Sequence, residues 1–343
     1  MKKHLLTITI ILAGLVSFSA CQDEEDIIPS NDYSPIRGGF PQGTTMYDSL
    51  IYDIKQEYGV YLIYKNITEN DLNRNWVTDV ADGPYIAGYE DERNDTAWHL
   101  PEKHLPFYVD FFYNHIFPNI KKDSTISYDF AKSSFPVKIY MIHNLRVDTT
   151  VNKSATVGDP YKSIKIGTFD NWAISFKDEI INGGDDEYTM QQQRCIFMLK
   201  AIYNSMEKGD ITVPEEFWEG LHFEKERKIE YKDSTSENYK YRLGFIDEIY
   251  DHFGTGRLKE LWRPLYQTVK SCEYWERGYH ASYNLFNVYM KSAMWFTPEE
   301  FREYYHTDEY PIVAEKYEIT VKHLLENYGV DLQGIARGVK NKK

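Results

Sequence analysis

Residues 185–208 read DDEYTMQQQRCIFMLKAIYNSMEK, and the pattern of this stretch decides how the whole chain is interpreted. Apolar residues recur every three or four positions, which predicts a long helix with one buried face. Gly183 and Gly184 stand directly before this helix and separate it from a region with strand patterns. The buried face is expected to carry Cys195, Ile196, Leu199, Ile202, Tyr203 and Met206.

The sequence before the long helix predicts a small sheet and two helices. Thr44 and Thr45, followed by Asp48, are typical of a capped helix start, and Gly59 is typical of a helix end. β-Branched and aromatic residues further on predict strands, the last two of which form a hairpin. The expected elements are helices at 44–59 and 106–118, strands at 60–64 and 135–142, a loop at 79–95, and a hairpin of 162–168 with 172–176.

The sequence after the long helix predicts helices only. A charged stretch with few apolar residues, 222–242, is expected to be a mobile excursion between them. Strands in the first half and helices in the second half predict an α+β fold. We expect one domain over residues 44–338, with two lobes, 44–184 and 185–338, as the alternative division. The expected later helices are 243–252, 257–275, 279–295, 298–305 and 311–328.

Composition and charge exclude some classes of function. The chain of 343 residues is 42% hydrophobic and 27% charged, which is typical of a globular protein. Its net charge of −14 argues against binding of a nucleic-acid backbone, so we expect no nucleic-acid partner. Aromatic residues make up 16% of the chain, which suits either an aromatic-rich core or a surface that stacks on ligands.

The N-terminus has the pattern of a bacterial lipoprotein signal peptide. Lys2 and Lys3 precede an apolar run, Leu5–Phe18, that is shorter than the roughly 20 residues needed to span a bilayer. Small residues then lead into Cys21, as in a lipobox, so we expect residues 1–20 to be removed and Cys21 to be diacylated, for example with palmitate. The alternative is an ordinary secretory signal cleaved nearby, with Cys21 unmodified.

Residues 21–43 are expected to be a flexible, acidic tether. The run Gln22-Asp-Glu-Glu-Asp26 resembles the signal that directs some lipoproteins to the outer face of the outer membrane, and it would also keep a tether solvated. Removal of Lys2 and Lys3 leaves 37 basic against 53 acidic residues, a net charge of about −16. We therefore expect a lipid-anchored protein of the cell outer membrane that faces the extracellular side.

The chain from residue 44 to 338 resembles the zinc-binding metallopeptidases that occur as surface lipoproteins in bacterial nutrient-uptake gene clusters. The likeness rests on the order of elements, on Val213-Pro-Glu-Glu-Phe217 after the long helix, and above all on the final helix with its tail, Tyr328-Gly-Val-Asp-Leu332. The resemblance implies a zincin-like α+β fold. It also implies partners, namely an outer-membrane transporter of the starch-utilisation type and its lid lipoprotein.

The sequence departs from this family at the catalytic motif. Members carry H-E-x-x-H on the long middle helix, where two histidines one turn apart bind zinc and the glutamate activates water. Here the corresponding residues, Arg194–Asn204, contain no histidine, and none occurs between His143 and His222. The resemblance thus implies an inactive homologue without zinc or other cofactor, which binds peptide or glycan as an accessory of nutrient uptake. The alternatives are a zinc metallopeptidase with atypical ligands and a glycan-binding lipoprotein.

Few other residues are candidates for chemistry or binding. Glu248 and His252 lie four residues apart on an expected helix and form a weak candidate metal site, against the simpler interpretation of a solvated helix face. Cys195 and Cys272 are expected in the core, where they would pair if they were adjacent. Aromatic candidates for contact with a ligand or partner are Trp275, Tyr279, Tyr304 and Tyr305, of which the last two are expected to be exposed.

Overall fold

The computed structural model divides into two units, Met1–Phe40 and Pro41–Lys343. It describes residues 36–68, 71, 85–86, 89–90, 96–97, 100–122, 125–147, 164–166, 171–183, 187–221, 230, 232–247 and 281–337. In the first unit the described residues form a turn, in which the Gly39 N–H donates to the Ile36 carbonyl. No described helix is both long and apolar enough to cross a membrane.

The second unit contains a four-stranded sheet in the order β1-β5-β8-β7. β1 (Tyr61–Ile63), β5 (Lys138–Met141) and β8 (Asn171–Ile174) run parallel, and β7 (Ile164–Ile166) pairs antiparallel with β8. Leu62, Ile139 and Trp172 face one another across the three parallel strands. All three side chains are buried, so helices must cover the sheet.

α2 (Met46–Tyr58) begins with a polar cluster that ties the helix to the sheet. Asp48 accepts hydrogen bonds from the Thr45 N–H and hydroxyl, as in a capping box, and from the Tyr64 hydroxyl at 2.7 Å. Tyr64 follows β1 directly. Asp48 is only 1% exposed, and its charge is tolerated there because three donors point at it.

A continuous helical region leads from the segment after β1 toward the centre of the unit. It consists of η1 (Glu102–His104), α4 (Leu105–Asp110), the π-helical η2 (Phe111–Ile116) and η3 (Phe117–Asn119). Pro106 and Pro118 stand near the starts of α4 and η3, where a missing N–H costs nothing. Phe111 and Phe112 of η2 are fully buried, and both pack edge-on against Phe197.

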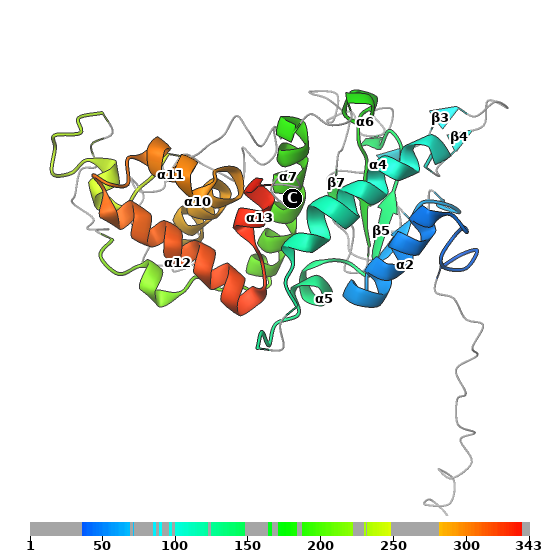
Figure 1. The fold of residues 1–343 in the computed structure, drawn as a ribbon, viewed down its shortest axis with the longest axis horizontal. Helices are drawn as coiled ribbons and strands as arrows, with labels where there is room; N and C mark the ends of the chain where they lie inside the picture. Colours follow the sequence, from blue (N-terminus) through cyan, green and yellow to red (C-terminus); the bar gives the residue numbers. More distant parts are fainter. Residues whose placement is uncertain are drawn as a thin grey trace, which may run out of the picture. The chain divides into compact units, whose positions relative to one another are not determined.

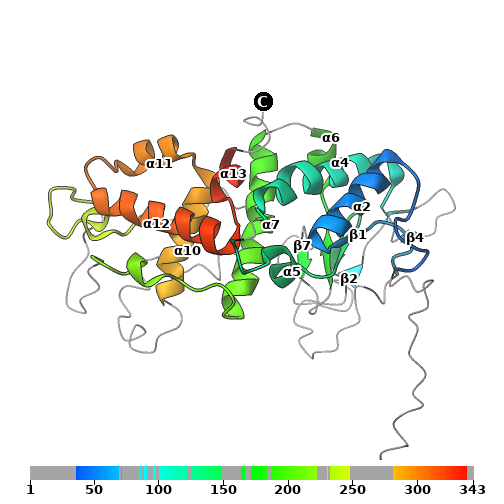
Figure 2. The ribbon, with the colours of Figure 1, turned by 60° about the horizontal axis from the view of Figure 1, so that its bottom comes forward.

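α7 (Glu187–Glu207) lies between the sheet and the C-terminal helices (Figures 1 and 2). On one side it contacts η2 and α5 (Phe130–Ser134), and its Phe197 ring lies 5.7 Å from Trp172 of β8. On the other side it contacts α10 (Ala281–Trp295) and α13 (Leu332–Arg337). Because α7 is covered on both sides, residues 193–199 are all buried.

Capping residues define where the C-terminal helices begin and end, and a tight turn follows α12. α11 (Pro298–Tyr305) begins with a Thr297–Glu300 capping box, and α12 (Pro311–Tyr328) ends at Gly329 with φ 71°. A side chain at position 329 would collide with the backbone carbonyl of Lys121, because the Lys121 N–H donates to the Gly329 carbonyl at 2.7 Å. The Gly-Val-Asp-Leu tail therefore joins α12 to η3 before α13 begins.

The described elements confirm the α+β class, with the sheet in the first half and helices in the second. α2, α7, α10, α11 and α12 match expected helices, and β1, β5 and the β7–β8 hairpin match expected strands. The short helices α5, α6 (Asp178–Gly183), η5 (Glu215–Phe217) and α13 were not expected. The zincin-like architecture and the domain boundaries stay predictions.

Two expectations were wrong in the described residues. The loop expected at 79–95 contains parts of short strands: β2 (Tyr85–Ile86) pairs with β6 (Arg146–Val147), and β3 (Tyr89–Glu90) pairs with β4 (Thr96–Ala97). The helix expected at 243–252 is absent from residues 244–247. The 3₁₀ helix η6 (Lys240–Leu243) ends there because Gly244 takes φ 79°, which a continuing helix excludes. The expected helix at 257–275 lies outside the described residues.

The Asp48 cluster predicts a pH-dependent loss of stability. Burial raises the pKa of Asp48, but hydrogen bonds from Thr45 and Tyr64 outweigh it and hold the pKa below its ordinary 3.8. Ionised Asp48 therefore stabilises the fold above about pH 4, and this contribution is lost as the pH falls through the lowered pKa. Asp48→Asn is expected to lower the free energy of unfolding by about 1–3 kcal/mol at pH 7 and by less at pH 3.

Urea unfolding at both pH values measures this difference. Asp53→Asn, a change of the same charge on the exposed side of α2, is the control and should cost less than about 0.5 kcal/mol. An Asp48→Asn effect of equal size at pH 3 and pH 7 would contradict the role given to the carboxylate.

Candidate functional site

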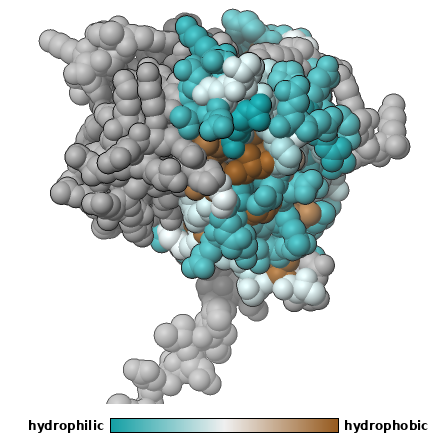
Figure 3. All heavy atoms as spheres, turned by 90° about the vertical axis from the view of Figure 1, so that its left-hand side faces the viewer, coloured by the Kyte–Doolittle hydropathy of each residue, from teal (hydrophilic) through white to brown (hydrophobic). Residues whose placement is uncertain are grey.

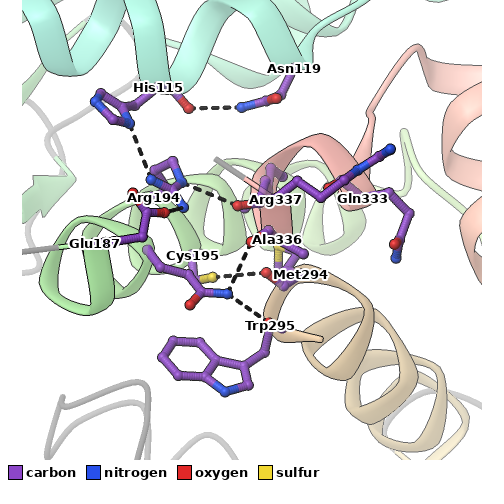
Figure 4. A network of polar contacts seen from close by, with 12 residues as sticks. His115, Asn119, Glu187, Arg194, Cys195, Met294, Trp295, Gln333, Ala336 and Arg337 are labelled. Carbon is purple, nitrogen blue, oxygen red and sulfur yellow. Dashed lines mark hydrogen bonds and ion pairs between the residues drawn. The ribbon is translucent and has the colours of Figure 1, made fainter. Parts of the chain in front are cut away.

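The inner face of α7 holds a buried arginine where the resemblance implies a zinc-binding motif. Arg194 is 0% exposed, and each of its three nitrogens has a partner (Figure 4). Nη2 donates to Glu187 Oε1 at 2.6 Å, Nε donates to the Ile335 carbonyl at 3.1 Å, and Nη1 lies 3.1 Å from His115 Nδ1. A buried guanidinium requires such partners, because an unpaired buried charge is costly.

The partners of Arg194 define the tautomer of His115. A guanidinium only donates hydrogen bonds, so His115 Nδ1 must accept, and the ring proton of a neutral His115 lies on Nε2. Nε2 is 3.4 Å from Asp110 Oδ2, and this hydrogen bond holds the pKa of Asp110 below its usual range. The result is a chain Asp110–His115–Arg194–Glu187 that links α4, η2 and α7.

The neighbours of Arg194 on α7 are equally unsuited to metal binding. Cys195 is a free cysteine whose thiol donates to the Met294 carbonyl at 3.3 Å. Burial raises the pKa of this thiol to about 12, so the metal-binding thiolate does not form at neutral pH. Gln191 donates to the carbonyls of Trp295 and Ala336 (Figure 4). Through these hydrogen bonds, Gln191, Arg194 and Cys195 tie α7 to α10 and α13.

The aromatic pair on α11 is divided between surface and core. Tyr304 is 51% exposed, as expected, and stacks on Phe296 with ring centroids 4.8 Å apart. The expected exposure of Tyr305 was wrong, because Tyr305 is fully buried. Its hydroxyl donates to the Asp247 carbonyl at 2.8 Å and bonds to Ser292 at 3.0 Å. Tyr305 lies one turn after the buried Phe301 and shares its face of α11, whereas Tyr304 points about 100° away from Tyr305.

The remaining predicted site residues cannot be placed. Cys21, Glu248, His252, Cys272, Trp275 and Tyr279 lie outside the described residues. Asp247, which directly precedes Glu248 in the sequence, is described. It forms an ion pair with Lys240 and accepts a hydrogen bond from the Tyr241 hydroxyl. Tyr241 and Leu243 are buried, so the end of the stretch 222–242 packs into the core and the expected mobile excursion does not extend to it.

A hollow of about 310 Å³ lies between α11 and α12. Phe301, Tyr317 and Leu325 contribute apolar surface, and charged side chains of α11 and α12 are also part of the lining. Seen from the side of these helices, the described surface is mainly hydrophilic, with a hydrophobic patch near its centre and smaller hydrophobic areas around it (Figure 3).

The structure brings together three potential metal ligands that the sequence did not reveal. His104 ends η1, His143 follows β5, and Asp178 begins α6 after β8. One ligand atom of each residue lies within 4.8 Å of the others. The two Nε2 atoms are 3.9 and 4.0 Å from Asp178 Oδ1, and the imidazole centroids are 4.9 Å apart. These residues are 35 or more positions apart in the sequence, so no local spacing signals them.

Burial governs the electrostatics of this cluster. It lowers the pKa of both imidazoles, and the positive charge of Lys103 lowers both pKa values further. The Asp178 carboxylate acts in the opposite direction on each of them. Both histidines are therefore held in the neutral form, which is the form that coordinates metals.

The buried α7 network predicts a large loss of stability in Arg194→Met. The substitution removes three donors and leaves the Glu187 carboxylate without its buried partner, so we expect a loss of about 3 kcal/mol in the free energy of unfolding. Glu187→Gln added to Arg194→Met should recover part of this loss, because the uncompensated charge is then gone. Chemical unfolding measures both, with the exposed Lys208→Met as the control. Equal stabilities of Arg194→Met and the control would contradict the role of the network.

Comparisons with known proteins give one distant structural similarity. No protein-family model and no curated protein matches the sequence. Among solved structures, the chain is similar to a "putative zinc-binding metallo-peptidase" from Bacteroides caccae, with a TM-score of 0.39 and 13% sequence identity over 86% of this chain and 92% of that chain. A likeness at this TM-score carries no argument, and the α+β class rests on the strands and helices described above.

Proposed function

We propose that this chain is a lipid-anchored protein of the outer-membrane surface that binds a nutrient, peptide or glycan, without cleaving it. In this proposal it acts as an accessory of a nutrient transporter and its lid lipoprotein. Attachment through Cys21 is supported by the basic start, the short apolar run and the lipobox-like residues before Cys21. Two acyl chains are sufficient for stable attachment to a membrane.

The non-catalytic part of the proposal is carried by the inner face of α7. In the family that the sequence resembles, this helix must present two imidazoles on one face, which bind zinc together with a third ligand. Arg194 occupies the buried face here. Its guanidinium is bonded to Glu187, Ile335 and His115. A positive charge held at that point would repel a divalent cation.

The sheet supports peptide as one class of ligand. β7 is paired only with β8 among the described strands, and an extended peptide would add to its other edge. Strand addition uses backbone hydrogen bonds and needs no catalytic residue. The exposed Tyr304, stacked on Phe296, supports glycan as the alternative class, because sugar rings stack on such aromatic faces.

Purification from the native outer membrane tests the proposal. The tagged, lipidated chain is expected to co-purify with a transporter and its lid lipoprotein in mild detergent. Cys21→Ser should move the chain from the membrane fraction to the soluble fraction, because both acyl chains are lost with the thiol. Mass spectrometry of the eluate and fractionation of the variant give the two results.

Peptide cleavage separates this proposal from the enzymatic alternative. A peptide library incubated with the purified chain should remain intact with and without a chelator. Chain recovered without partners, together with cleavage that a chelator stops, would establish a metallopeptidase with atypical ligands and overturn the proposal. Tryptophan fluorescence during titration with peptides and oligosaccharides then distinguishes the two ligand classes.

A further inference from the structure

We propose that His104, His143 and Asp178 form a binding site for a divalent transition-metal ion, with zinc as the preferred ion. The site lies at the sheet edge where the parallel strands end, and it uses no residue of α7. It is therefore independent of the proposed function and of the H-E-x-x-H motif that the sequence lacks.

The positions of the three residues match a metal site in geometry. Three atoms that lie no more than 4.8 Å apart leave a point within about 2.8 Å of all of them. Zinc bonds to nitrogen and oxygen are about 2.0–2.2 Å long, so closure by well under 1 Å per ligand completes the site. Both Nε2 atoms already face the same oxygen, Asp178 Oδ1.

His104 supplies an independent observation that points to a missing ligand. Its side chain is only 5% exposed, and its Nδ1 is buried without a hydrogen-bond partner among the described residues. The carboxylate oxygen nearest to its other nitrogen is 3.9 Å away, beyond hydrogen-bond distance. A metal ion bound at Nε2 would give that nitrogen the partner that Asp178 Oδ1 does not provide at this distance, and it would place the ring proton on Nδ1.

A buried tyrosine holds the three segments that carry the ligands. Tyr108, four residues after His104 on α4, is 0% exposed. Its hydroxyl donates to the carbonyl of Ile142, next to His143, at 2.8 Å. The same oxygen accepts from the N–H of Phe176, two residues before Asp178, at 2.8 Å. One side chain therefore positions all three ligand-bearing segments, as partners of metal ligands commonly do.

The fold places this cluster where parallel sheets bind ligands. β1, β5 and β8 end at the same edge, and His143 lies two residues after β5 and Asp178 four residues after β8. The segment before His104 is held at the same edge by the Leu100 N–H, which donates to the Tyr64 carbonyl at 3.0 Å. Crevices beyond the carboxyl ends of parallel strands are the usual ligand sites of such sheets.

The donor set favours zinc over magnesium or calcium. Two imidazole nitrogens and one carboxylate suit zinc and its neighbours in the first transition series, whereas magnesium and calcium prefer oxygen ligands only. The side chain of Asp178 is 59% exposed, so the remaining coordination positions face solvent. An open zinc site of this kind accepts water or an oxygen donor such as the carboxylate of a peptide.

Zinc titration of the full chain in mild detergent, without a polyhistidine tag, tests the proposal by calorimetry. The chain is expected to bind one equivalent of zinc, and Asp178→Asn should weaken binding by at least about tenfold. Glu179→Gln removes the same charge from the next exposed residue of α6 and should leave the affinity within about twofold. Cobalt in place of zinc gives a visible spectrum that reports nitrogen ligands.

Two further variants make the result decisive. Lys103→Gln removes a positive charge close to both imidazoles, so it should strengthen zinc binding severalfold. His252→Gln tests the other histidine site suggested by the sequence and should have no effect. Absence of stoichiometric zinc binding, or binding that Asp178→Asn leaves intact, would overturn the proposal. Loss of binding in His252→Gln alone would overturn it in favour of that site.

Discussion

The burial of α7 between the sheet and the C-terminal helices is the constraint on which the described structure depends. A helix enclosed on both sides must be apolar along most of its length, and residues 195–199 satisfy this requirement. Arg194, a fully buried charge of this helix, is tolerated because each of its nitrogens has a partner. Those partners belong to α7, η2 and α13, so the same hydrogen bonds also hold the two halves of the unit together.

The same burial limits what the described side chains of α7 can do. The described part of α7 holds a buried arginine with a partner for each nitrogen and a thiol whose pKa burial raises to about 12. Titratable side chains with incomplete partners occur instead at the end of the parallel strands, around His104 and Asp178. Arg194 at the centre of the unit has a partner for each nitrogen, whereas His104 Nδ1 at the edge where the strands end has none among the described residues. Tyr108 connects the two, because it reaches from α4 to that edge.

The structure explains why the tail after α12, Tyr328-Gly-Val-Asp-Leu332, has this sequence. Gly329 is needed for its left-handed conformation and for the close approach of Lys121, and Asp331 caps the N–H of Gly334 at the start of α13. The N–H of Asp331 also donates to the Asn119 carbonyl at the end of η3. Each residue of this pattern serves the junction between the C-terminal helices and the rest of the unit. The contacts of Gly329 and Asp331 therefore give this pattern a role in the architecture.

The local sequence pattern was sufficient to predict the elements that depend on residues close together in the chain. Capping at Thr45 and Thr297, glycine at the ends of α2 and α12, and the apolar period of α7 could all be interpreted from the sequence, because each depends on neighbours within about four residues. Tertiary structure alone decided which of Tyr304 and Tyr305 is buried and that Arg194 is enclosed. It alone brought His104, His143 and Asp178 together, because parallel strand pairing joins segments that no sequence period relates.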